Sequence, residues 1–276
     1  MIQNINWYPG HMKKTRELIQ ENLKAVDLVI ELLDSRIPIS SRNPIIDELV
    51  GDKRRIVLLG KSDLADSEET EKWQRYFSRK GDKTLAIDAR SGENINRLFS
   101  ILDDVQREKN QQRQMNRSIR MMVVGVPNVG KSSLINRLIG KKSAKTGDKA
   151  GVTRGKQWVT LKNGMQLLDT PGILWPKFED QRVGLYLAFC GSIRDEILDT
   201  QDLAFELIKV LEKRYPESLQ NRYKLDEIQE ETLDNMEAIA FERGFLMPGK
   251  RIDYERTGRT CLLYTSPSPR DRTRSR

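Results

Sequence analysis

Residues 119–140, IRMMVVGVPNVGKSSLINRLIG, decide the fold of this chain. The apolar run at 119–124 predicts a buried strand, and the residues that follow Lys131 have the pattern of a helix. Between them, residues 125–132 match the pattern G-x-x-x-x-G-K-[ST]. A loop of this pattern between a strand and a helix points its backbone N–H groups at phosphate oxygens, beside the positive end of the helix. We therefore expect a phosphate-binding loop here.

The same pattern assigns roles to the residues of this loop. We expect Lys131 to reach the β- and γ-phosphates of a nucleotide and to act in catalysis, and the Ser132 hydroxyl to bind Mg²⁺. The residues expected to contact the nucleotide are Asn128, Val129, Gly130, Lys131, Ser132 and Ser133.

Strand-like and helix-like segments alternate on both sides of the loop. Apolar runs predict strands within residues 26–34, 54–63, 83–92, 157–161 and 165–170. Amphipathic patterns predict helices within residues 12–24, 68–81 and 94–110. The last two strands are joined by Asn163-Gly164, a strong hairpin signal. This alternation predicts an α/β fold with a mostly parallel sheet and helices on both faces.

Two segments lie outside this alternation. Residues 109–118 are polar, and we interpret them as a linker. After residue 180 the strand patterns stop, and helical patterns at 202–215 and 225–244 predict a small all-helical domain.

A second motif, Asp169-Thr-Pro-Gly172, comes at the end of an apolar strand. An aspartate in this position holds the water shell of Mg²⁺. The Gly172 N–H can approach a γ-phosphate because no side chain obstructs it. Thr153, in the sequence GVTRG between the two motifs, is expected to bind the nucleotide and to complete the Mg²⁺ shell.

A third motif, Lys61-Ser62-Asp63, follows an earlier apolar run. A carboxylate at Asp63 can accept from guanine N1–H and N2–H₂ together, a donor pair that adenine lacks, while Lys61 lies along the base. The usual guanine motif is Asn-Lys-x-Asp, but Gly60 occupies the asparagine position. That asparagine normally contacts the base and ties this loop to the phosphate loop. If an unmade hydrogen bond is the whole effect, the change costs about 1–3 kcal/mol of binding.

The stretch Asp88-Ala-Arg-Ser-Gly92 resembles the Ser-Ala-Lys turn of GTP-binding proteins, whose alanine N–H contacts the guanine oxygen. We expect Ala89 and Arg90 to contact the nucleotide.

The order of these motifs is informative. Ordinary GTPases begin with the phosphate loop and end with the guanine motifs, whereas here the guanine motifs come first. A fold can survive when its chain is cut and rejoined elsewhere. We predict a circularly permuted P-loop GTPase domain over residues 1–180 that hydrolyses GTP. A helical domain follows at 181–260, and we expect its position to depend on whether the bound nucleotide carries a γ-phosphate.

Residues 261–276 read CLLYTSPSPRDRTRSR and resemble translated adapter or vector sequence, so we expect a non-native tail. The chain carries a net charge of +8, and the tail holds four arginines and one aspartate, which leaves +5. A basic protein often binds a polyanion such as a phosphate backbone.

Composition also excludes several classes of protein. No apolar run is long enough to span a membrane, so we expect no membrane partner. The N-terminal residues lack the apolar core of a signal peptide. Two cysteines, Cys190 and Cys261, cannot build a disulfide framework or a zinc site. These features favour the cytoplasm.

Taken together, these motifs resemble the circularly permuted GTPases, and specifically the ribosome biogenesis GTPase A family. The resemblance spans about residues 1–260 and includes NWYPGHM (6–12), DSRIP (34–38), the phosphate loop and GVTRG–DTPG. It implies a role in late assembly of the large ribosomal subunit, with ribosomal RNA and not DNA as partner. It also implies that the C-terminal helical domain contacts the particle. We expect a monomer.

Hydrolysis also needs a group that orients the attacking water. Many GTPases place glutamine directly after the DxxG motif, but Ile173 occupies that position and cannot hydrogen-bond. The family resemblance implicates His11, the only histidine of the chain. It also implies that Asn128 helps to bind K⁺, although a loop asparagine can simply bond local backbone. Turnover should be slow alone and faster with a partner.

Two other functions fit the sequence. Ile173 and Gly60 also suit a nucleotide-gated RNA-binding scaffold with negligible hydrolysis. A permuted ATPase is a third interpretation, because Gly60 weakens the guanine motif.

Overall fold

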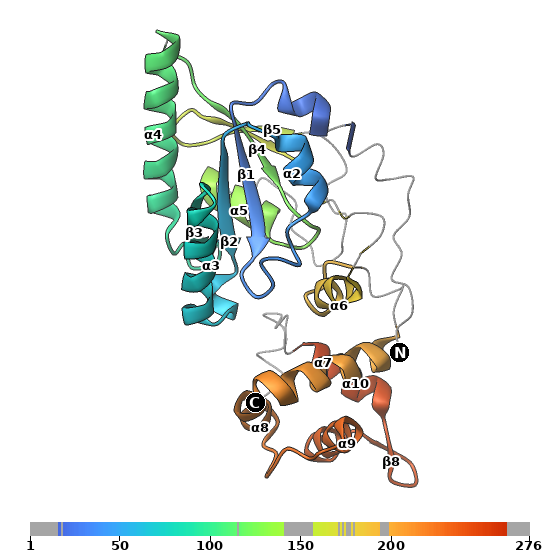
Figure 1. Cartoon of the computed structure of the whole chain (residues 1–276). Coiled ribbons are helices and arrows are strands. Elements are labelled where there is room, and N and C mark those ends of the chain that lie inside the picture. The colour runs from blue at the N-terminus through green and yellow to red at the C-terminus, as the bar shows by residue number, and fades with distance from the viewer. Residues whose placement is uncertain are drawn as a thin grey trace. The chain divides into compact units, whose positions relative to one another are not determined.

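The computed structural model describes residues 16–17, 19–114, 116–140, 157–170, 172, 174, 178, 180–193 and 199–263. Contacts within the chain define two units, which divide between Val183 and Gly184, three residues past the expected boundary. Figure 1 shows the elements of both.

The larger unit is built on a central sheet. Its strands are β1 (Leu28–Asp34), β2 (Arg55–Gly60), β3 (Lys83–Ile87), β4 (Arg120–Val124), β5 (Gln157–Thr160) and β6 (Gln166–Asp169). Within the described residues their order across the sheet is β3-β2-β1-β4-β6-β5. All neighbours are parallel except β5, which runs antiparallel to β6. The mostly parallel α/β sheet predicted from the sequence is confirmed.

The strands form where the apolar runs predict them. Every residue of β1 is buried, as expected of an inner strand covered on both faces. The hairpin between β5 and β6 turns at Asn163-Gly164, where Gly164 has a φ of +80°, in the left-handed region that glycine tolerates.

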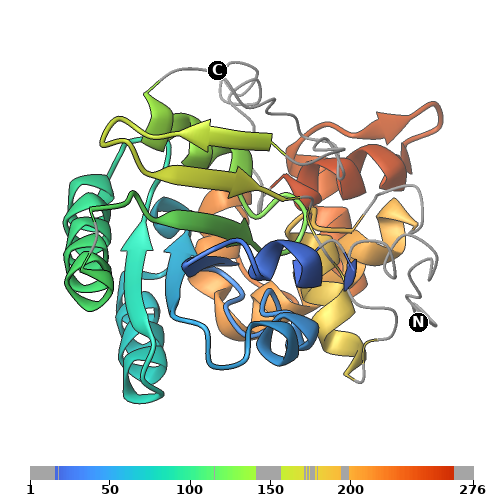
Figure 2. The same cartoon turned by 90° about the horizontal axis from the view of Figure 1, so that it is seen from above.

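Helices connect the strands and cover the sheet (Figures 1 and 2). They are α2 (Pro44–Val50), α3 (Ser67–Arg79), α4 (Ile95–Arg113) and α5 (Lys131–Ile139), with a short 3-10 helix at Ser62–Leu64. Side-chain caps start two of them. The Asn43 side chain, directly before α2, accepts from the Ile45 N–H. The Asp66 side chain, directly before α3, accepts from the Glu69 N–H.

Two apolar clusters join helices to one face of the sheet, the face on which the odd-numbered residues of β1 lie. Val29 packs with residues of α2, including Ile46, and Leu33 packs with Phe77 of α3. In Figure 1, α5 lies behind the sheet, on the opposite face from α2 and α3. Helices on both faces are therefore confirmed.

The expected linker at 109–118 is partly wrong, because α4 continues through Arg113. The polar residues at this point are mostly good helix formers, so the helix does not need an apolar stripe to continue. It ends at Gln114, which has a left-handed φ of +51°.

The smaller unit is helical in the region described. Its elements are α7 (Thr200–Arg214), α8 (Pro216–Tyr223), α9 (Thr232–Glu242), α10 (Tyr254–Leu262) and the short strands β7 (Leu246–Met247) and β8 (Arg251–Ile252), while α6 (Gln181–Phe189) spans the division. The β7–β8 pair departs from the all-helical domain that we predict.

The predicted helix at 225–244 is wrong over its first turns. The Asn235 side chain accepts from the Gln229 N–H and donates to the Gln229 carbonyl, which keeps that backbone out of a helix. Helix α10 continues through Leu262 with Cys261 buried, so it enters the segment where we expect a non-native tail. No helix among the described residues is long and apolar enough to cross a membrane.

Candidate nucleotide site

The site lies where the strand order reverses. From β1 the chain proceeds outward to β2 and β3, and β4 then pairs with the other side of β1. In open α/β sheets, ligands bind at such a reversal, beyond the carboxyl ends of the strands. The phosphate loop follows β4, and the guanine motif follows β2.

The phosphate loop has the predicted context, since it connects β4 directly to α5. Gly125 has a φ of +156°, and a Cβ built on it would lie 2.5 Å from the Leu32 carbonyl oxygen. Gly130, the residue before α5, has a φ of +109°. Both glycines are required by the backbone path, which brings loop N–H groups to the N-terminus of α5.

Lys131 is buried at the start of this helix. Its Nζ donates to the carbonyl oxygens of Gly125 at 3.1 Å and Val126 at 2.9 Å. Burial lowers the pKa of Lys131 to about 8, although the Asp169 carboxylate opposes this shift. The ammonium is thus held against the backbone of the phosphate loop.

The DxxG motif lies against this loop. Asp169 ends β6 and is buried, and Thr170 Oγ1 donates to the Val123 carbonyl of β4. A Cβ built on Gly172 would lie 2.6 Å from Pro127 Cα and 3.0 Å from Lys131 Nζ. Only a glycine allows this approach.

The oxygen ligands at this point fit Mg²⁺. The Asp169 carboxylate and the Ser132 hydroxyl, in the first turn of α5, are hard oxygen donors. The described residues contain no cluster of three or more acidic, histidine or cysteine side chains that would form a metal site of their own. This composition suits Mg²⁺, which usually keeps several waters and takes further ligands from substrate phosphates.

The guanine motif reaches the phosphate loop through Lys61. Lys61 has a left-handed φ of +58°, and its Nζ donates to the Asn128 carbonyl oxygen at 2.8 Å. Asp63, in the 3-10 helix that follows, is exposed. The loop-to-loop tie that we expect Gly60 to have lost is therefore present, but Lys61 provides it.

Gly60 itself packs tightly. A Cβ built on it would lie 2.9 Å from Leu32 Cδ1. An asparagine here would need Leu32 to shift, so a glycine suits this sheet.

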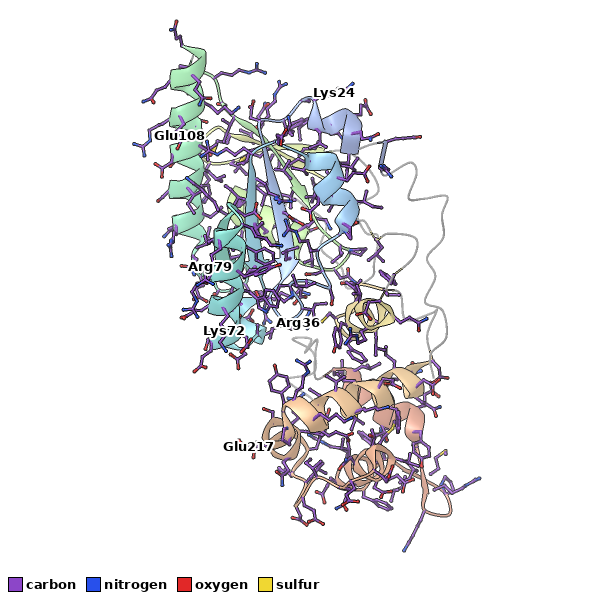
Figure 3. All side chains as sticks on the ribbon, in the orientation of Figure 1. Lys24, Arg36, Lys72, Arg79, Glu108 and Glu217 are labelled. Carbon is purple, nitrogen blue, oxygen red and sulfur yellow. The ribbon has the colours of Figure 1, made fainter. Side chains whose placement is uncertain are left out.

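The residue that sequence reasoning missed is Asp34, at the end of β1. Its buried carboxylate accepts from Lys61 Nζ at 3.0 Å and from Arg36 Nε and Nη2 at 2.8 and 2.6 Å. Burial alone would raise the pKa of Asp34, but Lys61 and Arg36 outweigh it and lower the pKa to about 2. Figure 3 labels Arg36, which lies beyond the carboxyl end of β1. An acidic residue as the last residue of a mostly apolar strand was the available signal.

The turn at 88–92 is tied to α5. Asp88 accepts from the N–H groups of Arg90 and Ser91, and Arg137 of α5 donates to the Ala89 carbonyl at 2.8 Å. Burial alone would raise the pKa of Asp88, but the hydrogen bonds from Ser91 and Arg90 outweigh it and lower the pKa. The turn therefore lies at the edge of the same site.

The remaining predicted residues differ in their exposure or lie outside the described part of the chain. Val129 is buried, Ser132 is half-buried and Ser133 is exposed. His11 and Thr153 lie outside the described residues, as does Ile173.

Comparisons with known proteins agree with this geometry. The family described as "50S ribosome-binding GTPase" matches residues 120–240, and the family described as "RsgA GTPase" matches residues 50–179. Ribosome biogenesis GTPase A of Priestia megaterium is 49% identical, with 94% of this chain and 91% of the relative covered. That of Bacillus cereus is 48% identical, with 94% and 88% covered.

Solved structures show the same fold. A GNP-bound structure of YlqF from T. maritima matches with a TM-score of 0.61 and 28% identity, over 91% of this chain and 93% of the other. A GDP-bound structure of TM YlqF matches with a TM-score of 0.65 and 26% identity, over 90% and 93%.

The fold, the order of the motifs and these matches define a circularly permuted P-loop GTPase, an enzyme that hydrolyses GTP. Within that class, the chain belongs to the ribosome biogenesis GTPase A family.

Proposed function

We propose that this GTPase acts in late assembly of the large ribosomal subunit in the cytoplasm, as a monomer whose turnover is slow alone and stimulated by the particle. The bond from Lys61 Nζ to the Asn128 carbonyl supports the GTP-binding part of this proposal most directly, because it joins the loop assigned to the base to the loop assigned to the phosphates. The relatives named for ribosome biogenesis suggest the partner, and the net charge of +5 that remains without residues 261–276 suits ribosomal RNA.

We assign roles to the site residues accordingly. The Asp63 carboxylate accepts from guanine N1–H and N2–H₂, and the Ala89 N–H donates to the guanine oxygen, with Lys61 along the base. The loop amides bind the β-phosphate and Lys131 neutralises developing charge on the γ-phosphate. The nucleotide contacts are Lys61, Ser62, Asp63, Ala89, Arg90, Asn128, Val129, Gly130, Lys131, Ser132, Ser133, Thr153 and Gly172.

Ser132, Thr153 and Asp169 are the Mg²⁺ ligands in this proposal. When bound, Mg²⁺ neutralises charge on the β- and γ-phosphate oxygens. Gly172 brings its N–H to the γ-phosphate. We assign K⁺ binding to Asn128, whose φ of +55° bends the loop at this residue.

Hydrolysis also needs a group that orients the attacking water. Ile173 follows the DxxG motif and offers no hydrogen bond, so we assign this role to His11. Replacing His11 with alanine is expected to remove particle-stimulated hydrolysis while GDP binding stays unchanged. Unchanged stimulated turnover would exclude His11 from the mechanism.

The decisive experiment measures GTP turnover with and without large-subunit particles, together with co-sedimentation in a GTP analogue and in GDP. We expect binding to the particle in the analogue, release in GDP and faster turnover with particles. Turnover is expected to be faster in K⁺ than in Na⁺ at equal ionic strength. Nucleotide-dependent binding without turnover in any condition would favour the scaffold function instead.

The base assignment has its own test. Replacing Asp63 with asparagine should weaken GTP binding and reduce its advantage over ATP. If the preference for GTP over ATP is the same in the variant as in the unmodified protein, another group selects the base.

A further inference from the structure

Arg137 links the helix after the phosphate loop to a turn much earlier in the chain. It lies in α5, and its Nε donates to the Ala89 carbonyl at 2.8 Å while its Nη2 donates to the Arg90 carbonyl. Lys131, which begins the same helix, is a phosphate-binding residue in the proposed function. One helix therefore contacts both ends of the nucleotide site.

The same turn is bound from its other side by Asp88. One carboxylate oxygen accepts from the Arg90 N–H at 2.7 Å, and the other accepts from the Ser91 N–H at 3.0 Å. The Ala89 carbonyl and the Arg90 N–H belong to one peptide plane, and the Arg90 carbonyl and the Ser91 N–H belong to the next. Since peptide units are planar, each of these planes is held from two sides. The Ala89 N–H belongs to the preceding plane, whose Asp88 carbonyl accepts from the Gly92 N–H at 2.9 Å.

Packing at Gly92 agrees with this arrangement. A Cβ built on Gly92, whose φ is +92°, would lie 3.4 Å from Arg137 Cζ. The guanidinium thus lies close against the turn. A planar guanidinium can serve two neighbouring carbonyls at once, whereas a lysine ammonium is a single flexible point charge.

We propose that Arg137 is a positioning residue for guanine selection, which fixes the turn at 88–92 so that the Ala89 N–H meets the guanine oxygen. This inference rests on the assignment of Ala89 in the proposed function. Arg137 does not touch the nucleotide in this scheme. Its effect should therefore appear only for a base that carries the oxygen.

The test compares GDP with 6-thio-GDP by isothermal titration calorimetry. The thio analogue keeps N1–H and N2–H₂, the donors for Asp63, but its sulfur is a weak acceptor for the Ala89 N–H. The variants are Arg137→Ala and Arg137→Lys. Arg107→Ala is the matched control, because Arg107 is an exposed arginine on α4 that pairs only with Asp104 among the described residues.

We expect Arg137→Ala to weaken GDP binding about fivefold to tenfold, the loss that one or two hydrogen bonds produce. Binding of 6-thio-GDP should change less than about twofold, so that discrimination between the two ligands falls. Arg137→Lys should restore part of the discrimination, and Arg107→Ala should leave it intact.

Equal weakening of both ligands would overturn the proposal, because it would indicate a general structural role. So would unchanged discrimination in Arg137→Ala. If the unmodified protein binds both ligands equally, the Ala89 assignment fails and the inference about Arg137 fails with it. That result leaves the Asp63 assignment and the ribosomal role untouched, since their own experiments do not involve the guanine oxygen.

Discussion

The phosphate side and the base side of the site are built in different ways. The phosphate loop is one contiguous segment between β4 and α5, shaped by glycines and backbone groups. The base side is assembled from distant residues: Lys61 is held by Asp34, and the turn at 88–92 is held by Arg137. The phosphate side can therefore be recognised from a local sequence pattern. The base side can be recognised only once the sheet has brought its distant residues together.

This difference predicts how each side fails. The phosphate side has little room, so it should be sensitive to added atoms and to loss of the buried Lys131 ammonium. The base side depends on side-chain contacts across the chain, so it should be sensitive to their removal.

Replacing Lys131 with methionine should have the largest effect. Methionine keeps most of the length but not the charge that the proposed function assigns to the γ-phosphate. We expect GTP hydrolysis to fall about 10³-fold, within the range for loss of a transition-state donor. Single-turnover assays measure this, with Lys72→Met, an exposed lysine on α3, as the control. Hydrolysis within threefold of the unmodified protein would contradict the assignment.

Replacing Gly172 with alanine tests the lack of room on the phosphate side. The new Cβ would lie 2.6 Å from Pro127 Cα, and backbone cannot move aside as a flexible side chain can. We expect hydrolysis to fall about 10²-fold because the γ-phosphate contact is displaced, while GDP binding stays within about threefold. Gly244→Ala is the control, since it adds the same methyl group at a position with open space around it, where the φ of +65° leaves backbone strain as the only cost.

A Gly172→Ala variant with full hydrolytic activity would show that the DxxG backbone does not need this close approach. A variant that also loses GDP binding would show instead that the change damages the loop as a whole.

On the base side, replacing Asp34 with alanine removes the buried acceptor of Lys61 and Arg36. Breaking a buried ion pair in this way costs about 3–5 kcal/mol of stability. We also expect GDP affinity to fall about tenfold, because Lys61 loses a partner that orients it toward the phosphate loop. Asp34→Asn keeps one acceptor oxygen and should be milder in both respects.

The pH dependence of Asp34 gives an independent check. Its pKa is lowered to about 2 from 3.8, so its contribution to stability is complete above pH 4 and is lost as the pH falls toward 2. The shift corresponds to about 2 kcal/mol. Unfolding followed from pH 5 to pH 2 should show a smaller acid loss in Asp34→Asn than in the unmodified protein. An equal loss of stability in acid for both proteins would mean that the pairing of Asp34 with Lys61 and Arg36 does not stabilise the fold.

These examples show why the sequence predicts the two sides unequally. Strands, glycine loop and helix follow from local periodicity and the motif at 125–132, and they appear where expected. The role of Asp34 does not follow, because nothing local shows that β1 lies between β2 and β4. Arg137 was missed for the same reason: its partners lie far earlier in the chain, and only the permuted fold brings them to α5.

The boundaries that were wrong have local causes. The linker continues α4 because its polar residues are good helix formers. The start of α9 is delayed because Asn235 binds the backbone of Gln229, a choice that side-chain type alone does not dictate.

Strand β1 carries two buried carboxylates whose pKa values are shifted in opposite directions. Asp34 accepts close hydrogen bonds, whereas Glu31 lies 3.3 Å from Arg55 Nη1 and 3.7 Å from Arg42 Nε. Neither oxygen of Glu31 has a hydrogen bond among the described residues, and Asp47 and Asp82 share its arginines. Burial therefore raises the pKa of Glu31 to about 7, although the two arginines oppose the shift.

Replacing Glu31 with glutamine should have the smallest effect on nucleotide handling but a distinct effect on stability. A carboxyl whose pKa is raised from 4.5 to about 7 stabilises the fold fully below pH 4.5, and this contribution is lost as the pH rises to about 7. Glutamine does not ionise, so the variant should be similar to the unmodified protein at pH 4.5 and more stable relative to it at pH 8, by up to about 3 kcal/mol.

Thermal unfolding at pH 4.5, 6 and 8 measures this difference, with Glu71→Gln on the exposed surface of α3 as the control. GDP affinity should remain within about twofold, because the Glu31 side chain projects from the middle of β1 and not from its carboxyl end. A variant that is less stable than the unmodified protein at pH 8 would show that the ionised Glu31 is held by its arginines after all. Glu31 would then resemble Asp34, and the contrast between the two carboxylates would be lost.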